Sequence, residues 1–297
     1  MAENGRQMEP NEWASIDDFI LHLEKCRKFH SRNNTIYIEM EAKLKKFIGS
    51  STLVSGGSGK IKMGDFGEIV LPFFSMGNIN STHLFGLDEL ILFALYRSHK
   101  NSYKKVADVG ANIGLHSIIM SRNGWSVDSF EPDPEHLERL KENLKLNAVE
   151  NIKIIDKAVS NFSGEQEFIR ILGNTTGSHL AGAKESPYGE LKKYDVSVVN
   201  FVERMSEYDF CKLDVEGEEA NIFCSTVNEN WQNTDAVAEV GSELNAQRIF
   251  QHAKTQNIKI FSQKSNWGPV EALEDMPTSH REGSIFITVN KSQVFGS

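Results

Sequence analysis

Apolar positions in the N-terminal part of the chain follow two helical repeats and then a two-residue alternation. A capping box of Ser15 and Asp18 precedes the first helical repeat. Residues 60–74 alternate on either side of a glycine turn, which is typical of a β-hairpin. We therefore expect residues 1–86 to form an accessory segment of helices plus a β-hairpin, and no catalytic motif is evident in it.

Beyond residue 87, short apolar runs alternate with amphipathic helical segments. We expect strands at residues 106–109, 126–131, 151–156, 208–214, 235–240, 258–263 and 283–290. A further pair of strands, at 165–172 and 194–200, is predicted on either side of a polar loop at 173–189. Strands that alternate with helices indicate a parallel sheet with helical crossovers. Residues 87–297 are thus expected to form one α/β domain.

The composition is that of an ordinary globular chain, and it narrows the range of partners. The net charge of −9 argues against a nucleic-acid partner, because binding phosphates needs a basic surface. The three cysteines have no paired spacing, which fits a reducing compartment better than a disulfide framework. No signal peptide and no membrane-spanning apolar run is evident, so we expect a cytoplasmic protein without a membrane partner.

The stretch VADVGANIGLHSIIM, residues 106–120, has the pattern of a strand that turns sharply into a helix. In open α/β sheets, ligands bind beyond the carboxyl ends of the strands, where this turn lies. A dinucleotide site needs the spacing Gly-x-Gly-x-x-Gly after the strand. Here an acid, Asp108, comes first, and its charge would repel a pyrophosphate. Gly110 and Gly114 still allow the backbone to approach a ligand closely.

A second acid, Glu131, ends the next predicted strand, 21 residues after Gly110. A carboxylate at this place accepts hydrogen bonds from ribose hydroxyls in nucleotide-binding α/β folds. Asp108 with Glu131 therefore suits a ligand that has a cationic amino-acid end and a ribose but no bridging phosphate. S-adenosylmethionine fits this description, and a dinucleotide is the alternative because both ligands contain ribose.

Four sequence blocks together resemble the FkbM-type family of S-adenosylmethionine-dependent methyltransferases. They are VADVGANIGLHS (106–117), FEPDPEHLERLKENLKLN (130–147), IKIIDKAVSNFSGE (152–165) and FCKLDVEGEEANIF (210–223). The resemblance covers about residues 85–289. It implies a class I methyltransferase fold, which is a Rossmann-like sheet of seven strands, six parallel and one antiparallel, with helices on both faces. It also implies methyl transfer from S-adenosylmethionine, usually to a hydroxyl oxygen on a sugar or another small natural product.

The cofactor residues of that family carry over onto matching positions of this sequence. The resemblance implies that the methionine end of the cofactor is lined by Asp108, Gly110, Asn112 and Gly114. Glu131 would contact the ribose, and Asp156 to Ala158 would lie near the adenine. The chain departs from the family before the fourth block, where VVNFVERM (198–205) replaces the usual threonine-leucine-aspartate run. We therefore carry over no acceptor contact from that segment.

Methyl transfer is an in-line displacement, which requires alignment of the acceptor oxygen and removal of its proton. Asp214 and Glu216 end the fourth core strand and are candidates for a general base, a metal ligand or an acceptor-positioning group. Glu239 ends the fifth core strand in an apolar setting, and together with Asp214 it is a candidate pair for one divalent cation. His179, in the polar loop, is a further candidate base.

Two other functions are weighed against this interpretation. An NAD-dependent oxidoreductase is disfavoured because the dinucleotide glycine pattern is missing. A non-catalytic interaction module that only keeps the fold is disfavoured by the intact set of Asp108, Gly110, Glu131 and Asp214. The expected acceptor is a small hydroxylated molecule, and the accessory segment offers a surface for a homodimer.

Overall fold

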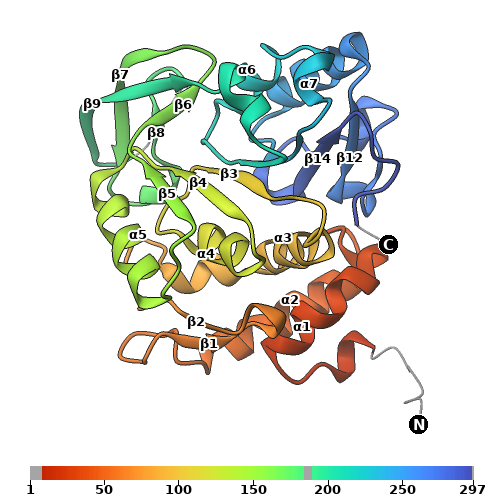
Figure 1. Cartoon of the computed structure of the whole chain (residues 1–297). Helices are drawn as coiled ribbons and strands as arrows, with labels where there is room; N and C mark the ends of the chain where they lie inside the picture. Colours follow the sequence, from red (N-terminus) through yellow and green to blue (C-terminus); the bar gives the residue numbers. More distant parts are fainter. Residues whose placement is uncertain (1–8, 184–188, 296–297) are drawn as a thin grey trace.

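An open twisted sheet runs through the middle of the molecule (Figure 1), and its strand order brings the predicted motifs together. The computed structural model describes residues 9–183 and 189–295. From one edge to the other, the sheet consists of β13 (Gly268–Pro269), β12 (Lys259–Ser262), β14 (Ser284–Thr288), β11 (Asp235–Glu239), β10 (Phe210–Leu213), β3 (Lys105–Val109), β4 (Ser126–Phe130) and β5 (Ile152–Ile155). The glycine turn thus follows a strand in the interior of the sheet.

The sheet differs from the seven-stranded prediction by one short strand. Six strands, β5, β4, β3, β10, β11 and β12, share one direction, while β14 runs antiparallel between β11 and β12. The eighth strand, β13, adds two residues that run antiparallel to β12 at the edge. The pair Gly268-Pro269 has no strand pattern, since proline cannot donate a ladder hydrogen bond and is confined to edges.

Helices cover both faces of the sheet. One face carries α3 (Leu87–Ser98), α4 (Leu115–Arg122) and α5 (Pro134–Leu146), and the other carries α6 (Glu219–Phe223) and α7 (Glu243–Gln256) (Figure 1). Neighbouring residues of a strand point to opposite faces. Phe210 therefore packs into the core with α3 and α4, and Cys211 packs into the core with α6 and α7. Across the described residues, no helix is long and apolar enough to cross a membrane.

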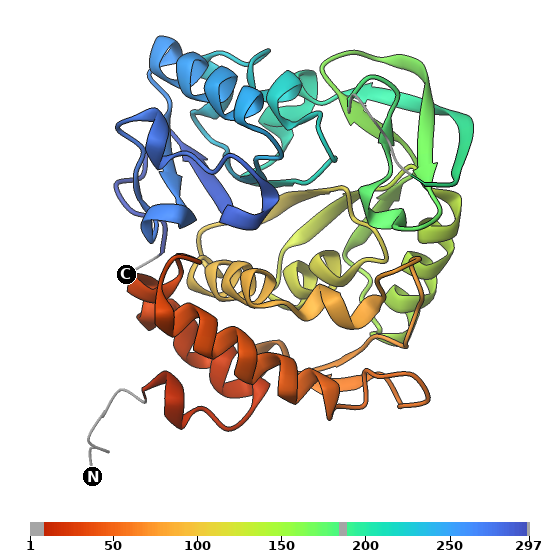
Figure 2. The same ribbon diagram turned by 180° about the vertical axis from the view of Figure 1, so that it is seen from behind.

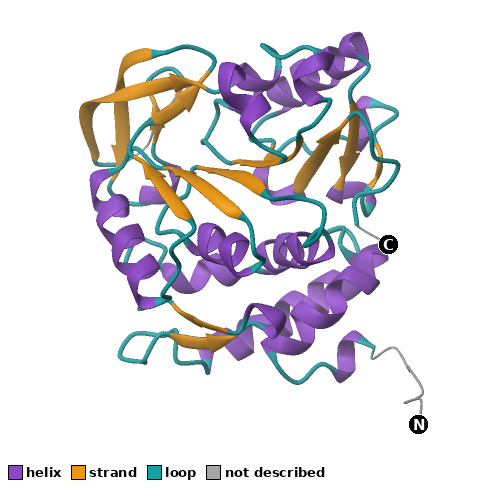
Figure 3. Cartoon of the chain, viewed as in Figure 1, coloured by secondary structure: helices purple, strands orange, loops and turns teal. Residues whose placement is uncertain are grey.

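A second, smaller sheet stands beside the ends of β4 and β5 (Figure 3). Its order is β6 (Ala158–Ser160), β9 (Leu191–Asn200), β7 (Gly164–Ile171) and β8 (His179–Leu180). β7 and β9 are the predicted extra pair, and they run antiparallel. The short strands β6 and β8 have no counterpart in the prediction, because so few residues show no periodicity. Residues 184–188 of the predicted polar loop lie outside the described residues.

The N-terminal residues form a further layer outside α3 and α4 (Figure 2). It contains the predicted helices, α1 (Ile16–His22) and α2 (Thr35–Gly49), and the predicted hairpin of β1 (Lys60–Lys62) and β2 (Glu68–Val70). The capping box of Ser15 and Asp18 is present at the start of α1. Residues 90–96 of α3 are all buried, because this layer covers the side of α3 that faces away from the sheet.

Polar contacts fasten the N-terminal layer to the rest of the molecule. Asp88, in the first turn of α3, accepts hydrogen bonds from the Tyr37 hydroxyl at 2.8 Å and from Gln263 Nε2 at 2.6 Å. Arg32 Nε also donates to Asp88, at 2.8 Å. The Ser31 amide donates to Asn266 Oδ1 at 2.8 Å, just beyond β12. The layer is therefore tied both to α3 and to the far edge of the sheet.

Candidate functional site

A cavity of about 260 Å³ opens at the carboxyl ends of β3, β4, β10 and β11. This is the edge at which open α/β sheets bind their ligands. The predicted site residues in its wall are Gly110, Asn112, Glu131, Ala158, His179, Asp214, Glu216 and Glu239. Three other predicted residues, Asp108, Gly114 and Asp156, are not part of the wall. The structure thus brings the nucleotide-type residues and the strand-end acids into one cavity.

The turn after β3 needs glycine at position 110. Gly110 has a φ of +81°, and a Cβ atom there would lie 1.8 Å from the carbonyl oxygen of Asp214. The backbone amides of Gly110 and Ala111 donate to the carbonyl oxygen of Phe130 at 3.0 and 2.9 Å, which holds the turn against the end of β4. The missing side chain therefore permits close contact between the ends of β3 and β10.

Two later positions of the turn have different roles. Asn112, at a φ of +53°, lines the cavity, and its buried Oδ1 has no hydrogen-bond partner among the described residues. A ligand that donates a hydrogen bond fits beside it. Gly114, at a φ of +89°, precedes α4, and a Cβ atom there would lie 3.1 Å from Leu140 Cγ. Gly114 thus serves the packing of α4 against α5 rather than contact with a ligand.

Asp108, the leading acid of the turn, is fully buried beneath the cavity. Its Oδ2 accepts a hydrogen bond from the Ser117 hydroxyl at 2.5 Å, and its Oδ1 lies 4.0 Å from Lys212 Nζ. Lys212 is thus a nearby positive charge, while Oδ1 itself has no hydrogen-bond partner among the described residues. Asp108 is not part of the cavity wall, and its contact with the amino-acid end of a ligand stays a prediction.

Glu131, the acid that follows β4, does reach the cavity. Its Oε2 accepts a hydrogen bond from the Asn112 amide and its Oε1 from the Asp133 amide, both at 2.8 Å. Burial raises the pKa of Glu131 to about 8, even though these two donors favour the ionised form. Each oxygen keeps another lone pair, so the carboxylate has capacity for two ligand hydroxyls. The placement is compatible with the expected ribose contact.

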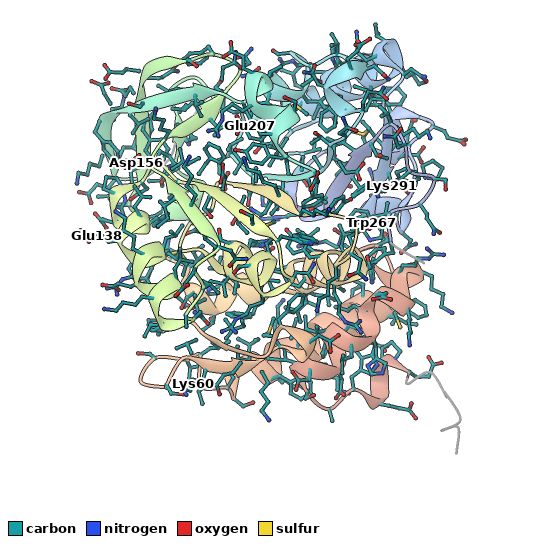
Figure 4. All side chains as sticks on the ribbon, in the orientation of Figure 1. Lys60, Glu138, Asp156, Glu207, Trp267 and Lys291 are labelled. Carbon is teal, nitrogen blue, oxygen red and sulfur yellow. The ribbon has the colours of Figure 1, made fainter. Side chains whose placement is uncertain are left out.

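The wall beyond β5 is formed by Lys157 and Ala158. Ala158 is buried, whereas Asp156 is exposed and lies at the edge of the molecule where the two sheets meet (Figure 4). Of the three residues predicted to lie near the adenine, Lys157 and Ala158 line the cavity, and Asp156 does not.

A buried lysine balances the acids at the end of β10. Lys212 Nζ lies 2.9 Å from Asp214 Oδ2. Burial disfavours the charge of Lys212, but the carboxylates of Asp214, Asp108 and Glu89 outweigh it and raise the pKa of Lys212 above its usual range. A charge taken out of water persists only when it is paired. Lys212 is therefore a fixed positive partner for two acids of the site.

The turn that follows Asp214 is held in place by Glu219. The Glu219 carboxylate accepts hydrogen bonds from the amides of Val215 at 2.7 Å and Gly217 at 2.9 Å. Between them, Glu216 has a φ of +55°, which is an uncommon conformation for a residue with a side chain. Burial raises the pKa of Glu219 to about 7. Glu219 thus fixes the turn that carries Glu216 to the cavity.

Glu239, at the end of β11, lines the cavity. Burial and the carboxylates of Asp214, Glu89 and Glu216 raise the pKa of Glu239 well above its usual range. These surroundings favour the neutral form of the side chain, which donates a hydrogen bond.

His179, in β8, belongs to the roof that the second sheet places over the cavity. Its ring is buried, and its Nδ1 lies 2.9 Å from the carbonyl oxygen of Gly177. Because a carbonyl only accepts, Nδ1 carries the proton and Nε2 carries the lone pair. His136 Nε2 lies 2.9 Å from the Thr175 hydroxyl, which ties this roof to α5. The predicted base therefore lies in the same cavity as the predicted acids.

Comparison with known proteins agrees with this arrangement. A family model described as the methyltransferase FkbM domain matches residues 108–255, which contain the glycine turn, Glu131, His179 and the strand-end acids. Over these residues the chain matches the FkbM methyltransferase domain. This finding confirms the resemblance seen in the sequence.

Individual relatives are distant. Methyltransferase sdnD of Sordaria araneosa is 27% identical over 163 residues, which cover 43% of this chain and 62% of that protein. The chain thus spans less than two thirds of the length of this curated relative. An S-adenosylmethionine-dependent methyltransferase from Agrobacterium tumefaciens shares 10% identity with a TM-score of 0.38, over 74% of this chain and 66% of that one. A ribosomal protein L11 methylase from Lactobacillus delbrueckii subsp. bulgaricus shares 13% identity with a TM-score of 0.36, over 66% of this chain and 75% of that one.

Two side chains of this FkbM methyltransferase site were not found from the sequence. Lys212 has an available signal, since it lies two residues before Asp214 in a strand and therefore shares its face. Glu89 lines the cavity from the first turn of α3. Nothing in the pattern of an apolar helix predicts that its first turn lies against the glycine turn, so Glu89 has no such signal.

Asp214 and Glu239 are the predicted metal-binding pair, and among the described residues they are not part of a larger group of metal-binding side chains. In the part of the chain that the structure describes, no group of three or more His, Cys, Asp or Glu side chains is arranged to hold a metal ion. Asp214 and Glu239 both line the cavity, but two carboxylates supply few of the ligands that a divalent cation takes. Metal dependence therefore stays a prediction.

Proposed function

We propose that this chain is an S-adenosylmethionine-dependent methyltransferase that methylates a hydroxyl group of a sugar or another small natural product. One observation carries the proposal: a single cavity contains the glycine turn and Glu131 at one end and Asp214, Glu216 and Glu239 at the other. A ribose-bearing donor would lie across the ends of β3 and β4, with its methyl group toward the acids of β10 and β11. The match of residues 108–255 to the FkbM methyltransferase domain supports the same reaction class.

The residues present fit this cofactor better than a dinucleotide. Gly110 leaves room for close backbone approach, Asn112 offers a buried acceptor, and Glu131 has lone pairs for two hydroxyls. A pyrophosphate would instead enter a cavity walled by several carboxylates, and like charges at short range in a partly buried site repel strongly. The electrostatics therefore favour a cationic ligand without phosphate.

When bound, the cofactor supplies a methyl group on a sulfonium, whose transfer forms a C–O bond, breaks a C–S bond and requires the hydroxyl proton to leave. We assign His179 as the acceptor of that proton, because its Nε2 has the lone pair in the tautomer set by Gly177. Asp214 and Glu216 accept hydrogen bonds from other hydroxyls of the acceptor and so orient it. Glu239, whose neutral form is favoured by burial and by the neighbouring carboxylates, donates a hydrogen bond to the acceptor when it is protonated.

Calorimetric titration of the full chain with S-adenosylhomocysteine, NAD and NADP tests the cofactor. We expect binding of S-adenosylhomocysteine alone, and we expect Glu131→Ala to weaken it by about tenfold or more, since hydrogen bonds to a charged group are lost. Binding of NAD without binding of S-adenosylhomocysteine would overturn the proposal in favour of an oxidoreductase.

A screen of hydroxylated acceptors then tests the reaction. Release of S-adenosylhomocysteine is followed with and without a chelator, so the same assay reports the acceptor and any metal requirement. Turnover with sugars or small hydroxylated natural products is the expected result. Turnover restricted to amines would contradict the assignment of an oxygen acceptor.

A further inference from the structure

We propose that Glu89, and not Asp108, is the carboxylate that receives the ammonium group at the amino-acid end of the cofactor. The inference rests on the proposed function, because it assumes a ligand of the S-adenosylmethionine type in the cavity. An ammonium group that leaves water needs a charged partner. The question is therefore which acid near the glycine turn is both ionised and within reach.

Asp108 is the acid that the sequence points to, but it lies beneath the cavity, and its buried Oδ1 has no hydrogen-bond partner among the described residues. It is fully buried, it accepts a hydrogen bond from Ser117 at 2.5 Å, and it faces Lys212 at 4.0 Å. It contributes nothing to the cavity wall.

Glu89 lines the same cavity as Gly110 and Asn112, and it also lines a small hollow together with Lys212, Asp214 and Glu239. Its side chain is 30% exposed, and its Oε2 lies 2.8 Å from His116 Nε2. Among the described residues, Oε1 has no hydrogen-bond partner, so one oxygen of the carboxylate remains for a ligand donor. Glu89 comes from α3, outside residues 108–255 that match the family model.

A chain of hydrogen bonds fixes the orientation of Glu89. The Tyr96 hydroxyl lies 2.9 Å from His116 Nδ1, and burial raises the pKa of Tyr96 well above its usual range, so this hydroxyl keeps its proton. Tyr96 thus donates to Nδ1, and His116 Nε2 donates to Glu89. The His116 ring also packs on Phe93, with centroids 5.0 Å apart. His116 follows Gly114 by two residues, and we assign it as the positioning residue that links Glu89 to the glycine turn.

The other acids of the cavity are less suited to this role. Asp214 is ion-paired with Lys212 at 2.9 Å. Burial and the neighbouring carboxylates raise the pKa of Glu239 and so disfavour its charged form, and Glu131 follows β4, where the ribose is expected. Of these acids, Glu89 is therefore the one that contacts the first turn of α4, directly after the glycine turn, and that has no direct contact with Lys212.

The experiment compares three ligands that differ at the amino-acid end. Wild type and Glu89→Gln are titrated with S-adenosylhomocysteine, with its deaminated analogue and with 5′-methylthioadenosine, which lacks the amino-acid end. We expect Glu89→Gln to weaken S-adenosylhomocysteine by about 10- to 100-fold and to leave the other two within about twofold, because one charge-assisted hydrogen bond is lost. Unchanged binding of 5′-methylthioadenosine also shows that the variant is folded.

Two matched variants complete the test. Asp108→Asn is expected to weaken all three ligands to a similar extent, because it loosens the turn, and Glu239→Gln is expected to leave S-adenosylhomocysteine within about twofold. The proposal is overturned if Glu89→Gln weakens the three ligands equally or not at all, or if Asp108→Asn selectively weakens S-adenosylhomocysteine. If the wild-type protein binds none of the three ligands, the proposed function fails as well. If the wild-type protein binds S-adenosylhomocysteine but Glu89→Gln has no selective effect, only the proposal for Glu89 fails.

The role of His116 has its own measurement. His116→Ala is expected to lower the preference for S-adenosylhomocysteine over its deaminated analogue, because Glu89 loses its fixed orientation. His116→Gln retains an N–H donor near the same place and should restore that preference. A merely structural role would instead change the affinities for both ligands together and leave their ratio as in wild type.

Discussion

The carboxylates around the cavity differ in their partners, and the partners decide what each can do. Asp214 faces Lys212, Glu131 accepts two backbone amides, and Glu89 is held by His116. Asp108 has the most prominent place in the sequence but is the one closed off from ligands. The contacts of each acid with its neighbours, and not its place in the sequence, therefore decide whether its carboxylate can bind a ligand.

Proton release on binding is a direct consequence of the state of Glu131. Ligand hydroxyls donate to the ionised carboxylate, so binding favours that form and lowers the pKa of Glu131 from its value of about 8 in the free protein. Between the two pKa values the complex holds fewer protons than the free protein. Titration of S-adenosylhomocysteine at pH 7 in buffers of different ionisation enthalpy should therefore show protons released. The same titration of Glu131→Gln should lose this contribution, and proton uptake by wild type would contradict the argument.

Replacement of His179 separates chemistry from cofactor binding. His179→Asn removes the lone pair of Nε2 and should lower kcat by about 10²- to 10⁴-fold, the usual contribution of a general base. The Kd for S-adenosylhomocysteine should stay near the wild-type value, because His179 lies in the roof rather than at the glycine turn. His83 is a second histidine of the cavity wall, exposed and bonded to the backbone of Asn80, and is the matched control. Equal losses of kcat in His83→Asn and His179→Asn would rule out His179 as the base.

At the scale of elements, the contact between the ends of β3 and β10 depends on one missing side chain. Gly110→Ala would bring a Cβ atom to 1.8 Å from the Asp214 carbonyl oxygen, so the two strand ends must separate. Gly124 has a similar φ of +94° but open space around it, so Gly124→Ala carries only the backbone strain of about 1–2 kcal/mol. Urea unfolding should show a larger loss of stability for Gly110→Ala, with loss of S-adenosylhomocysteine binding. Equal losses in the two variants would show that the close contact is unimportant.

Periodicity predicted the long elements well, because a helix or strand that faces a core repeats its apolar residues. The two N-terminal helices, the hairpin and the seven longer strands of the main sheet all occur near the predicted residues. The two- and three-residue strands β6, β8 and β13 escaped prediction, since they are set by neighbouring strands rather than by their own sequence. The cavity wall was predictable where a residue ends a parallel strand, as Glu131, Asp214 and Glu239 do. Glu89 was not, because its place depends on how α3 docks.

At the scale of the whole molecule, the N-terminal layer is part of the main core. Residues of α1 and α2 belong to the same hydrophobic cluster as α3, α4 and the sheet residues Val106 and Phe210. Removal of this layer would expose the outer side of α3, whose first turn carries Glu89. The boundary after residue 86, the homodimer and the cytoplasmic location stay predictions.

Asp88 tests how strongly the layers depend on one another. Asp88→Ala leaves the Tyr37 hydroxyl, Gln263 and Arg32 without their shared acceptor. A buried donor that is left without an acceptor costs about 1–3 kcal/mol of stability. We expect the free energy of unfolding in urea to fall by at least that amount. Asp65→Ala breaks the exposed pair with Arg97 and should cost about 1 kcal/mol or less. A smaller loss for Asp88→Ala than for Asp65→Ala would contradict the role given to Asp88.

The position of β14 has a consequence for how the chain is made. β14 lies between β11 and β12 although it follows both along the chain, and apart from the two-residue β13 it is the partner that attaches β12 to the sheet. A chain that emerges from the ribosome in order cannot place β12 until residues 284–288 are also free. Until then β11 presents an open edge to other chains, which is a known risk for aggregation. The sheet that carries the cavity is thus completed only after every residue of the site has already emerged.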